Sequence, residues 1–458
     1  MKKILIFWAV SFSYLLGLPV SASEGANIKH YNWSGIDVDL VLDERFPVYS
    51  LAVYFSDGAL SDADGEKGVT DTMLATIELG TRRFNQKEIS DHLEYFGANY
   101  SSYVNHEYST YTVSGLVKDV VPTMKMICHL FRDATFPEEE LKKIRERSRD
   151  SLANMVTSQG SLADWVFREL SLANTPYYYP VGGKLRDIPQ FTHKNLINKL
   201  DYFNDKVKKR IYITGPKNVL IVQKVIEEDC AWKDNENLFV RKNIYPKMAP
   251  QVATRLVLVT VPKANQAQVR IGRFITKEEM LPLSVLEMSS EYLGGGFTSK
   301  LMHEVRVKRG LTYSVGAFAS RQKDYGRAGI STSTKNDSVV ELLQVIRETI
   351  KDIQEGKVGD EEVERTRGQI VGSYPFRFER STQLLEQILY LNHIEVDPST
   401  LFSFPDEVKK VGKKELIAAI GTLFNWDKAV IVVLGSKDLK KSLESIAPVE
   451  VIDYQKFL

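Results

Sequence analysis

Arg306 and Tyr313, in the stretch RVKRGLTY, are two side chains whose types could take part in catalysis. A guanidinium and a phenol both donate hydrogen bonds, and donors aimed at an oxygen that gains negative charge stabilise the transition state of acyl transfer. The plainer interpretation is an exposed arginine on a helix and a tyrosine in the core of a strand. Residue types alone leave both interpretations open.

Histidine and cysteine, the residues that commonly bind transition metals, show no metal-site spacing. Cys128 and Cys230 are the only cysteines, and no Cys/His pattern of a structural zinc site surrounds them. An oxidising compartment would permit a disulfide between them. We expect buried free thiols instead, because the two are far apart and lie in partly apolar, helical stretches. His92, His106 and Glu107 could be proposed as a cluster, but their helix and strand patterns explain them as surface or packing residues.

The stretch GVTDTMLATIELGT, residues 68–81, predicts a buried helix. Met73, Leu74 and Ile77 recur at helical spacing on one face, and Gly80 stands where a glycine can end a helix. We therefore expect this helix to form a wall of a domain, with Leu74 and Ala75 on its buried apolar face.

Two stretches half a chain apart share one pattern, which indicates a duplicated domain. Each has an alternating strand, a polar turn, an amphipathic helix and then a helix with an acidic start, at Glu138 and, 222 residues later, at Asp360. Strands mixed with long helices favour an α+β fold of two homologous layered domains, each an antiparallel-dominated sheet with helices packed on one face. We place the domains at residues 30–240 and 250–458, joined through the polar residues 236–251.

The first 22 residues predict a secretory signal peptide. Lys2 and Lys3 precede an apolar run over residues 4–18, and small residues precede a cleavage site after Ala22. An uncleaved anchor is the alternative, but the run is short for a membrane span. A formal net charge of +1 argues against nucleic acid as the main partner. We therefore expect an exported, periplasmic protein without stable membrane insertion after the signal is removed.

The duplication, the helix over residues 68–81 and the stretch LGGGFTSKLMHEVRVKRGLTYSVGAF together resemble the insulinase/pitrilysin (inverzincin) family of zinc peptidases. In that family the helix carries H-x-x-E-H, whose histidines bind zinc and whose glutamate activates the metal-bound water. The resemblance places the histidines at Asp71 and Ala75 and the glutamate at Leu74. An alanine cannot bind zinc and a leucine cannot accept a proton, so the resemblance implies no metal site in this chain.

Two further positions of the family are only partly kept. The third zinc ligand would fall near Glu146 or Asp150, and an isolated carboxylate makes no metal site. The family's His-Pro-Tyr-Gly stretch matches residues 175–177 and the pair Gly182 and Gly183, with the histidine missing. The resemblance implies a structural role for this stretch, which would order a loop.

In the second half, the resemblance implies roles for residues that their types leave ambiguous. Arg306 and Tyr313 match the Arg/Tyr pair with which the family's C-terminal half reaches the substrate carbonyl, so we favour the functional interpretation. A loop that helps admit substrate in this family resembles the run Gly294, Gly295, Gly296 and Phe297. A flexible turn at a helix start explains this run equally well.

Some bacterial members of the family divide the work between two chains that close into a clamshell. The resemblance therefore implies a non-catalytic subunit of an exported heterodimeric zinc peptidase, with no cofactor of its own and with zinc in the partner chain. Arg306 and Tyr313 would complete the partner's site in trans, and the pair of chains would enclose peptides or unfolded polypeptides. The alternative is a peptidase-like scaffold or peptide-binding protein with no role in catalysis. An independent zinc peptidase would need ligands besides Asp71.

Overall fold

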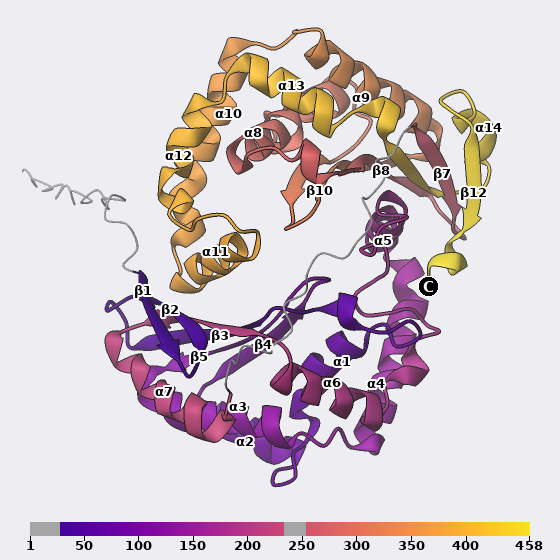
Figure 1. Ribbon diagram of the computed structural model, residues 1–458. Coiled ribbons are helices and arrows are strands. Elements are labelled where there is room, and N and C mark those ends of the chain that lie inside the picture. Colours follow the sequence, from indigo (N-terminus) through magenta and orange to yellow (C-terminus); the bar gives the residue numbers. More distant parts are fainter. Residues whose placement is uncertain (1–27, 233–252) are drawn as a thin grey trace, which may run out of the picture.

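The computed structural model describes residues 28–232 and 253–458, which form two halves built on one plan (Figure 1). The predicted signal peptide and the predicted junction over residues 236–251 lie outside the described residues. The first half contains β1 (Ile28–Trp33), β2 (Ile36–Leu42), β3 (Val48–Phe55), α1 (Val69–Ala75), α2 (Gln86–Tyr95), β4 (Asn99–Val104), β5 (Ser109–Leu116), α3 (Val120–Asp133), α4 (Glu138–Ala153), α5 (Gln159–Ser171), α6 (His193–Asp205), β6 (Lys209–Gly215) and α7 (Val222–Val225). The second half contains β7 (Arg255–Thr260), β8 (Gln266–Ile275), α8 (Leu283–Gly294), β9 (Val315–Arg321), β10 (Gly326–Lys335), α9 (Val339–Gln354), α10 (Asp360–Ser373), α11 (Ser381–His393), α12 (Thr400–Lys410), α13 (Lys413–Leu423), β11 (Val430–Gly435), α14 (Leu439–Leu443) and β12 (Val449–Asp453).

Each half is built around one mostly antiparallel sheet. Over the described residues, the strand order is β1-β2-β6-β3-β5-β4 in the first half and β12-β7-β11-β8-β10-β9 in the second. The parallel neighbours are β2 with β6, β7 with β11, and β7 with β12. The matching orders confirm the duplication, and the α+β fold with two layered domains is confirmed. No helix in residues 28–232 or 253–458 combines the length and the apolar character needed to cross a bilayer.

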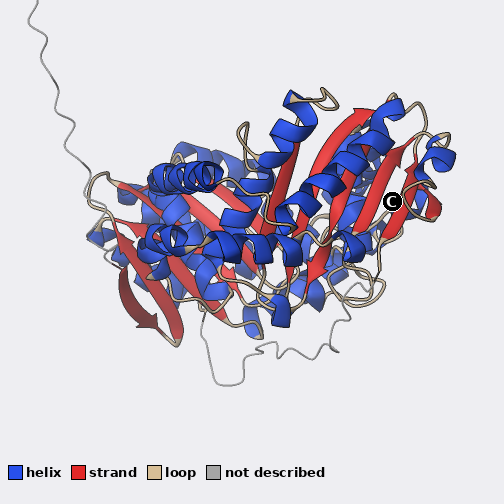
Figure 2. Cartoon of the chain, turned by 90° about the horizontal axis from the view of Figure 1, so that it is seen from above, coloured by secondary structure: helices blue, strands red, loops and turns tan. Residues whose placement is uncertain are grey.

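The two halves exchange a helix, and this exchange defines the inner face of each sheet. Most helices cover the outer faces, as the views from the side and from above show (Figures 1 and 2). α11 of the second half packs on the inner face of the first sheet, where Leu385 and Leu389 meet Ala52 and Tyr212. The predicted arrangement, with helices on one face only, was therefore incomplete.

α5 makes the reciprocal contact on the second sheet. Its residues Leu162, Val166 and Phe167 pack against Val257 of β7 and Val432 of β11. α5 begins at Gln159 and α11 at Ser381, so the exchanged helices occupy equivalent places in the repeat. Because each half buries an apolar helix of the other, the halves are held together by a shared core as well as by the chain.

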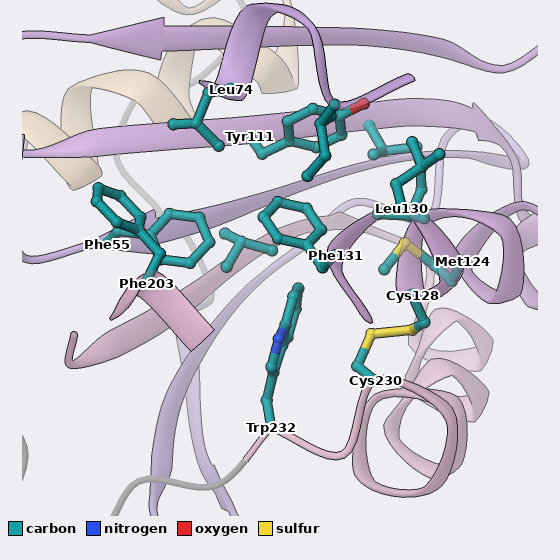
Figure 3. Close-up of a cluster of buried hydrophobic side chains, with 14 of the residues drawn as sticks. Phe55, Leu74, Tyr111, Met124, Cys128, Leu130, Phe131, Phe203, Cys230 and Trp232 are labelled. Atoms are coloured by element: carbon teal, nitrogen blue, oxygen red, sulfur yellow. A yellow bond between two sulfur atoms is a disulfide. The ribbon is translucent and has the colours of Figure 1, made fainter. Parts of the chain in front are cut away.

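The first core is filled by aromatic side chains between the sheet and the outer helices (Figure 3). The ring of Phe131 lies 5.7 Å from Phe55, 5.3 Å from Tyr111 and 5.2 Å from Trp232, measured between ring centroids. Leu74 of α1 belongs to the same cluster and is 1% exposed. The buried face predicted for this helix is therefore confirmed at Leu74.

Cys128 and Cys230 form a disulfide, so the expectation of free thiols was wrong. The bond joins α3 to the turn after α7 and closes a separation of 102 residues in the sequence (Figure 3). The sequence could not show this pairing, because it depends on α3 and α7 packing side by side.

Candidate functional site

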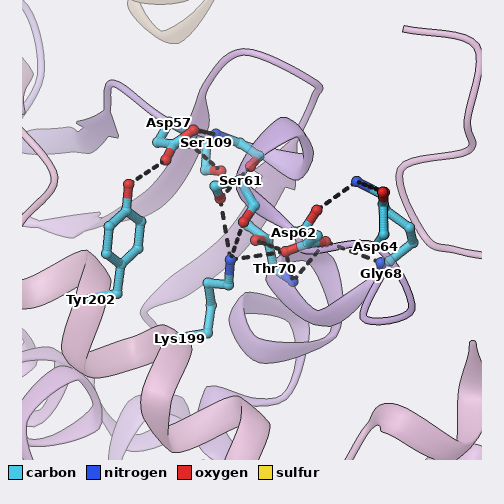
Figure 4. A network of polar contacts seen from close by, with 11 residues as sticks. Asp57, Ser61, Asp62, Asp64, Gly68, Thr70, Ser109, Lys199 and Tyr202 are labelled. Atoms are coloured by element: carbon cyan, nitrogen blue, oxygen red, sulfur yellow. Dashed lines mark hydrogen bonds and ion pairs between the residues drawn. The ribbon is translucent and has the colours of Figure 1, made fainter. Parts of the chain in front are cut away.

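The start of α1 is held by the buried carboxylate of Asp62 (Figure 4). This carboxylate accepts a hydrogen bond from the backbone N–H of Gly68 at 3.0 Å and another from the Thr70 hydroxyl at 2.5 Å. Nζ of Lys199, on α6, lies 3.0 Å from Oδ1 of Asp62. The first N–H groups of a helix have no partner within it, so Asp62 satisfies donors at the helix start while the ion pair ties α1 to α6.

Glycines let a loop approach the start of α1 closely. Gly68 has φ 90°, and a Cβ there would lie 2.6 Å from the carbonyl oxygen of Gly182. Gly183 has φ 77°, and its Cβ would lie 2.7 Å from the carbonyl oxygen of Lys67. Only glycine adopts such angles without strain, so these residues are required by the backbone contact whether or not the helix carries chemistry.

The three functional positions of the H-x-x-E-H pentad do not share one face of α1. Leu74, at the position of the catalytic glutamate, is buried in the core. Ala75, at the position of the last histidine, is exposed, so the expectation that it lies on a buried face was wrong. The apolar stripe of α1 runs through Met73 and Leu74, and Ala75 lies beside that stripe, on the same face as Asp71.

The described residues do not fit a zinc ion. Nothing in residues 28–232 and 253–458 brings together three or more His, Cys, Asp or Glu side chains that could hold a metal. Of the pentad positions, only Asp71 has a side chain that could bind a metal. Glu146 and Asp150, the candidates for the third ligand, are exposed on α4. The described residues therefore offer no set of side chains that fits a metal ion.

His92, His106 and Glu107 do not form a cluster either. His92 lies on α2, with Nε2 3.2 Å from the carbonyl oxygen of Pro122. His106 is 6% exposed, and its Nε2 lies 2.8 Å from the carbonyl oxygen of Tyr179. Burial lowers the pKa of His106 to about 4. Their role as packing residues, rather than metal ligands, follows from these separate partners.

Two carboxyl groups on the side of α1 that carries Ala75 have raised pKa values. Burial raises the pKa of Asp71, and the nearby Asp62 raises it further. Burial also raises the pKa of Glu78, and a backbone hydrogen bond offsets this only in part. The face of the helix on which the family carries its zinc-binding histidines therefore solvates negative charge poorly in this chain.

Arg306 and Tyr313 are both accessible and lie at one end of the second sheet. Arg306 is half-buried in the helical turn after α8, and its guanidinium stacks over the ring of Phe297 at 5.4 Å. Tyr313 is 87% exposed and precedes β9 by two residues. The interpretation of Tyr313 as a core residue is therefore wrong, and an exposed phenol can donate a hydrogen bond to a bound molecule.

β9 is an edge strand, which places these donors beside unpaired backbone groups. In the described sheet β9 pairs with β10 alone and ends the strand order. No second strand of the described sheet pairs with its other side.

The glycine run ends α8 and leads into the helical turn that begins at Lys300. Gly294 is buried, and a Cβ there would lie 2.3 Å from the backbone nitrogen of Ala317 on β9. Gly295 is the C-cap of α8. Gly296 follows and leads to Phe297, whose ring is 77% exposed. The run therefore serves a close approach between α8 and β9 and presents an exposed aromatic ring beside Arg306.

Sequence reasoning missed Asp62, Lys199 and the helix exchange. The cluster of Asp and Gly residues before α1 was the only sequence signal for Asp62, and it reads as an ordinary loop. The residues that couple the halves gave no signal, since their partners lie hundreds of positions away.

Comparisons with known proteins agree with the geometry. Two family models match the chain: Insulinase (Peptidase family M16) over residues 41–175, and Peptidase M16 inactive domain over residues 210–370. An uncharacterized zinc protease, YmxG, of Bacillus subtilis is 22% identical over 426 residues, which span 90% of this chain and 99% of that protein. A non-peptidase homolog, YmxG, of Helicobacter pylori is 21% identical over 437 residues, 91% of this chain and 94% of that protein.

Solved structures show the same fold. The crystal structure of a peptidase M16 inactive domain from Pseudomonas fluorescens matches with a TM-score of 0.80 and 19% identity, over 90% of this chain and 98% of that one. A protease from Helicobacter pylori matches with a TM-score of 0.78 and 14% identity, over 89% of this chain and 99% of that one. The similarity therefore extends over both halves.

Proposed function

The chain belongs to the insulinase (M16) peptidase family, as a peptidase-like member of the inactive type, and from this premise we propose that it is the non-catalytic subunit of an exported heterodimeric zinc peptidase. The zinc would be bound by a homologous partner chain that keeps H-x-x-E-H. This chain would supply Arg306 and Tyr313 to the shared site and help enclose a peptide or an unfolded segment.

The observation that carries the proposal is the contrast between the two halves. In the first half, Leu74 and Ala75 have replaced groups that zinc chemistry requires. In the second half, Tyr313 is exposed, and the half-buried Arg306 stacks on the exposed ring of Phe297. A phenol that is 87% exposed contributes little to the stability of its own chain, so its place is better explained by an external partner.

Two features support a role for Arg306 as a donor rather than as a structural cation. No carboxylate among the described residues pairs with it, whereas its neighbours Lys308 and Arg309 both pair with Glu304. Its guanidinium is instead held by the Phe297 ring, which orients it without neutralising its charge. A substrate carbonyl on which negative charge develops would be stabilised by such a donor.

Export is supported by the disulfide. Structural disulfides persist in oxidising compartments and are rare where thiols are kept reduced, and Cys128 and Cys230 are bonded here. A signal peptide over residues 1–22 and a periplasmic location accord with this. Cell fractionation, with N-terminal sequencing of the isolated protein, tests both; a reduced, cytosolic protein that retains Met1 would contradict the proposal.

The function is tested by reconstitution with a zinc-motif homologue from the same organism. We expect the pair to cleave peptides and each chain alone to be inactive. Arg306→Ala and Tyr313→Phe should each lower kcat about a hundredfold, because one donor to the developing oxyanion is lost. Arg309→Ala and Tyr95→Phe are the matched controls, since Tyr95 is 83% exposed and distant in sequence from the site. Equal cleavage by all four variants would contradict a shared site.

The second candidate is a peptidase-like scaffold or peptide-binding protein without a role in catalysis. The Helicobacter pylori relative named a non-peptidase homolog favours it. On this alternative the chain would bind peptides or a partner with unchanged affinity when Arg306 and Tyr313 are both substituted. Metal analysis of the purified chain should find no zinc on either account, and stoichiometric zinc would exclude both.

A further inference from the structure

A cavity of about 420 Å³ lies between the inner face of the first sheet and α11. Its floor consists of alternate residues of β3, β4 and β5 that point away from the first core. Its wall is formed by Leu385, Glu386 and Leu389 of α11, a helix of the other half. Six hydroxyl-bearing side chains line it: Ser50, Ser101, Thr110, Thr112, Ser114 and Thr382.

The lining hydroxyls are left without partners by the described residues. Over the described part of the chain, none of the six side chains makes a hydrogen bond to another residue. Ser50 is the clearest case, because it is 2% exposed and its Oγ is enclosed without a partner. Hydroxyls that face a cavity without a protein partner can pair with water or with the polar groups of a bound molecule.

The charge of the cavity excludes most classes of small ligand. Glu386 is its only charged side chain, so nothing there would bind a phosphate or a carboxylate. One carboxylate is also too few for Ca²⁺, which takes six to eight oxygen ligands. An added peptide strand cannot pair with β5, because β5 is already paired with β3 on one side and β4 on the other, and it could join the floor only at the edge strand β4.

A small neutral carbohydrate is the class of ligand that best matches this hydroxyl-lined cavity with its single carboxylate. A hydroxyl both donates and accepts hydrogen bonds, so Ser and Thr side chains can pair with sugar hydroxyls in either direction. Tyr103 is 55% exposed and its ring lies 5.9 Å from that of Tyr108, which offers flat apolar surface at the cavity edge. We propose that the hydroxyl-lined cavity between the first sheet and α11 binds a neutral mono- or disaccharide.

This inference is independent of the proposed function. The cavity uses neither Arg306 nor Tyr313, and it lies on the first sheet while those residues lie beside the second. α11 comes from the second half, so an occupied cavity would touch both halves. Bound sugar would therefore stabilise the contact between them by mass action.

The test is titration of the purified chain with maltose, cellobiose and N-acetylglucosamine, followed by calorimetry and by saturation-transfer NMR. We expect saturable binding of at least one sugar. Thr110→Val and Thr112→Val keep the shape of the side chain and remove its hydroxyl, and each should weaken binding about tenfold. Ser101→Ala, on the edge strand, is a second variant that tests the same site if the threonine variants unfold.

Ser102→Ala is the matched control, because Ser102 neighbours Ser101 on β4 but faces away from the cavity. It should bind the sugar with unchanged affinity. The proposal is overturned if none of the three sugars binds, or if the cavity variants bind as well as the natural chain. It is also overturned if glucose 6-phosphate or a Ser-Gly tetrapeptide competes for these hydroxyls as strongly as the sugar.

Discussion

His393, the last residue of α11, reaches across the molecule to Glu107 of the first half, with Nε2 3.0 Å from Oε2. The same ring places Nδ1 3.0 Å from the Tyr54 hydroxyl, and Tyr177 donates to the other oxygen of Glu107 at 2.7 Å. His393 is 7% exposed. The two halves are therefore joined by a buried polar contact as well as by the exchanged apolar helices.

Breaking this contact should weaken the fold. His393→Ala leaves the Glu107 carboxylate buried without its main partner, which we expect to cost about 3 kcal/mol of unfolding free energy. Denaturant unfolding at pH 7 measures the loss. Glu444→Gln, which alters an exposed pair within one helix, is the control and should change stability by less than about 0.5 kcal/mol. A loss for His393→Ala as small as that of the control would show that the contact does not hold the halves.

Glu107 should also make the unfolding free energy depend on pH in the acid range. Burial alone would raise its pKa, but hydrogen bonds from His393 and Tyr177 outweigh burial and hold the pKa below its usual value of 4.5. The native state therefore binds this proton less readily than the unfolded state. Stability from Glu107 is present above pH 4.5 and is lost as the pH falls through the lower native pKa. Glu107→Gln should flatten the curve of melting temperature against pH in this window; an unchanged slope would contradict the assignment.

Asp71 should behave in the opposite way. Burial and the nearby Asp62 raise its pKa, so the native state holds this proton more tightly than the unfolded state. Stability therefore falls as the pH rises from 3.8 through the higher native pKa. Asp71→Asn should be more stable than the natural chain at pH 7, and the gain should vanish below pH 3.8. Asp150→Asn, at an exposed position of α4, should show no such gain.

If the residues of H-x-x-E-H were restored in this chain, the largest loss of stability should come from position 74. Leu74→Glu would place a carboxyl in the core cluster and should cost about 3 kcal/mol or more. Ala75→His changes an exposed residue and should cost less than about 1 kcal/mol. Thermal unfolding of the two single variants compares them directly. Equal melting temperatures would mean that the core relaxes around the new carboxyl group.

The disulfide should carry a measurable part of the stability. Replacing both cysteines, as Cys128→Ala with Cys230→Ala, should lower the unfolding free energy by about 2–4 kcal/mol, because the unfolded chain regains the freedom that the bond removed. Reductant should destabilise the natural chain and leave the double variant unchanged. Two reactive thiols in the denatured but unreduced protein would show that the bond is absent in solution.

Local pattern was a good guide to the elements and a poor guide to their surroundings. The apolar spacing of α1 predicted a buried Leu74, and burial followed because Leu74 lies on the stripe that faces the core. Ala75 is also apolar, yet it is exposed, since composition does not say which side of a helix the sheet covers. Tyr313 was open to two interpretations for the same reason, and its exposed place before β9 decides against the core.

The sequence by itself determined the duplication, the α+β class, and the replacement of the family's histidines at Asp71 and Ala75 and of its glutamate at Leu74, because these depend on residue type and on periods of a few residues. The tertiary structure alone decided three relationships: the bond between Cys128 and Cys230, the contact of His393 with Glu107, and the cover that α5 and α11 give to each other's sheets. Each of these joins residues about a hundred or more positions apart, and such contacts form only when whole elements pack.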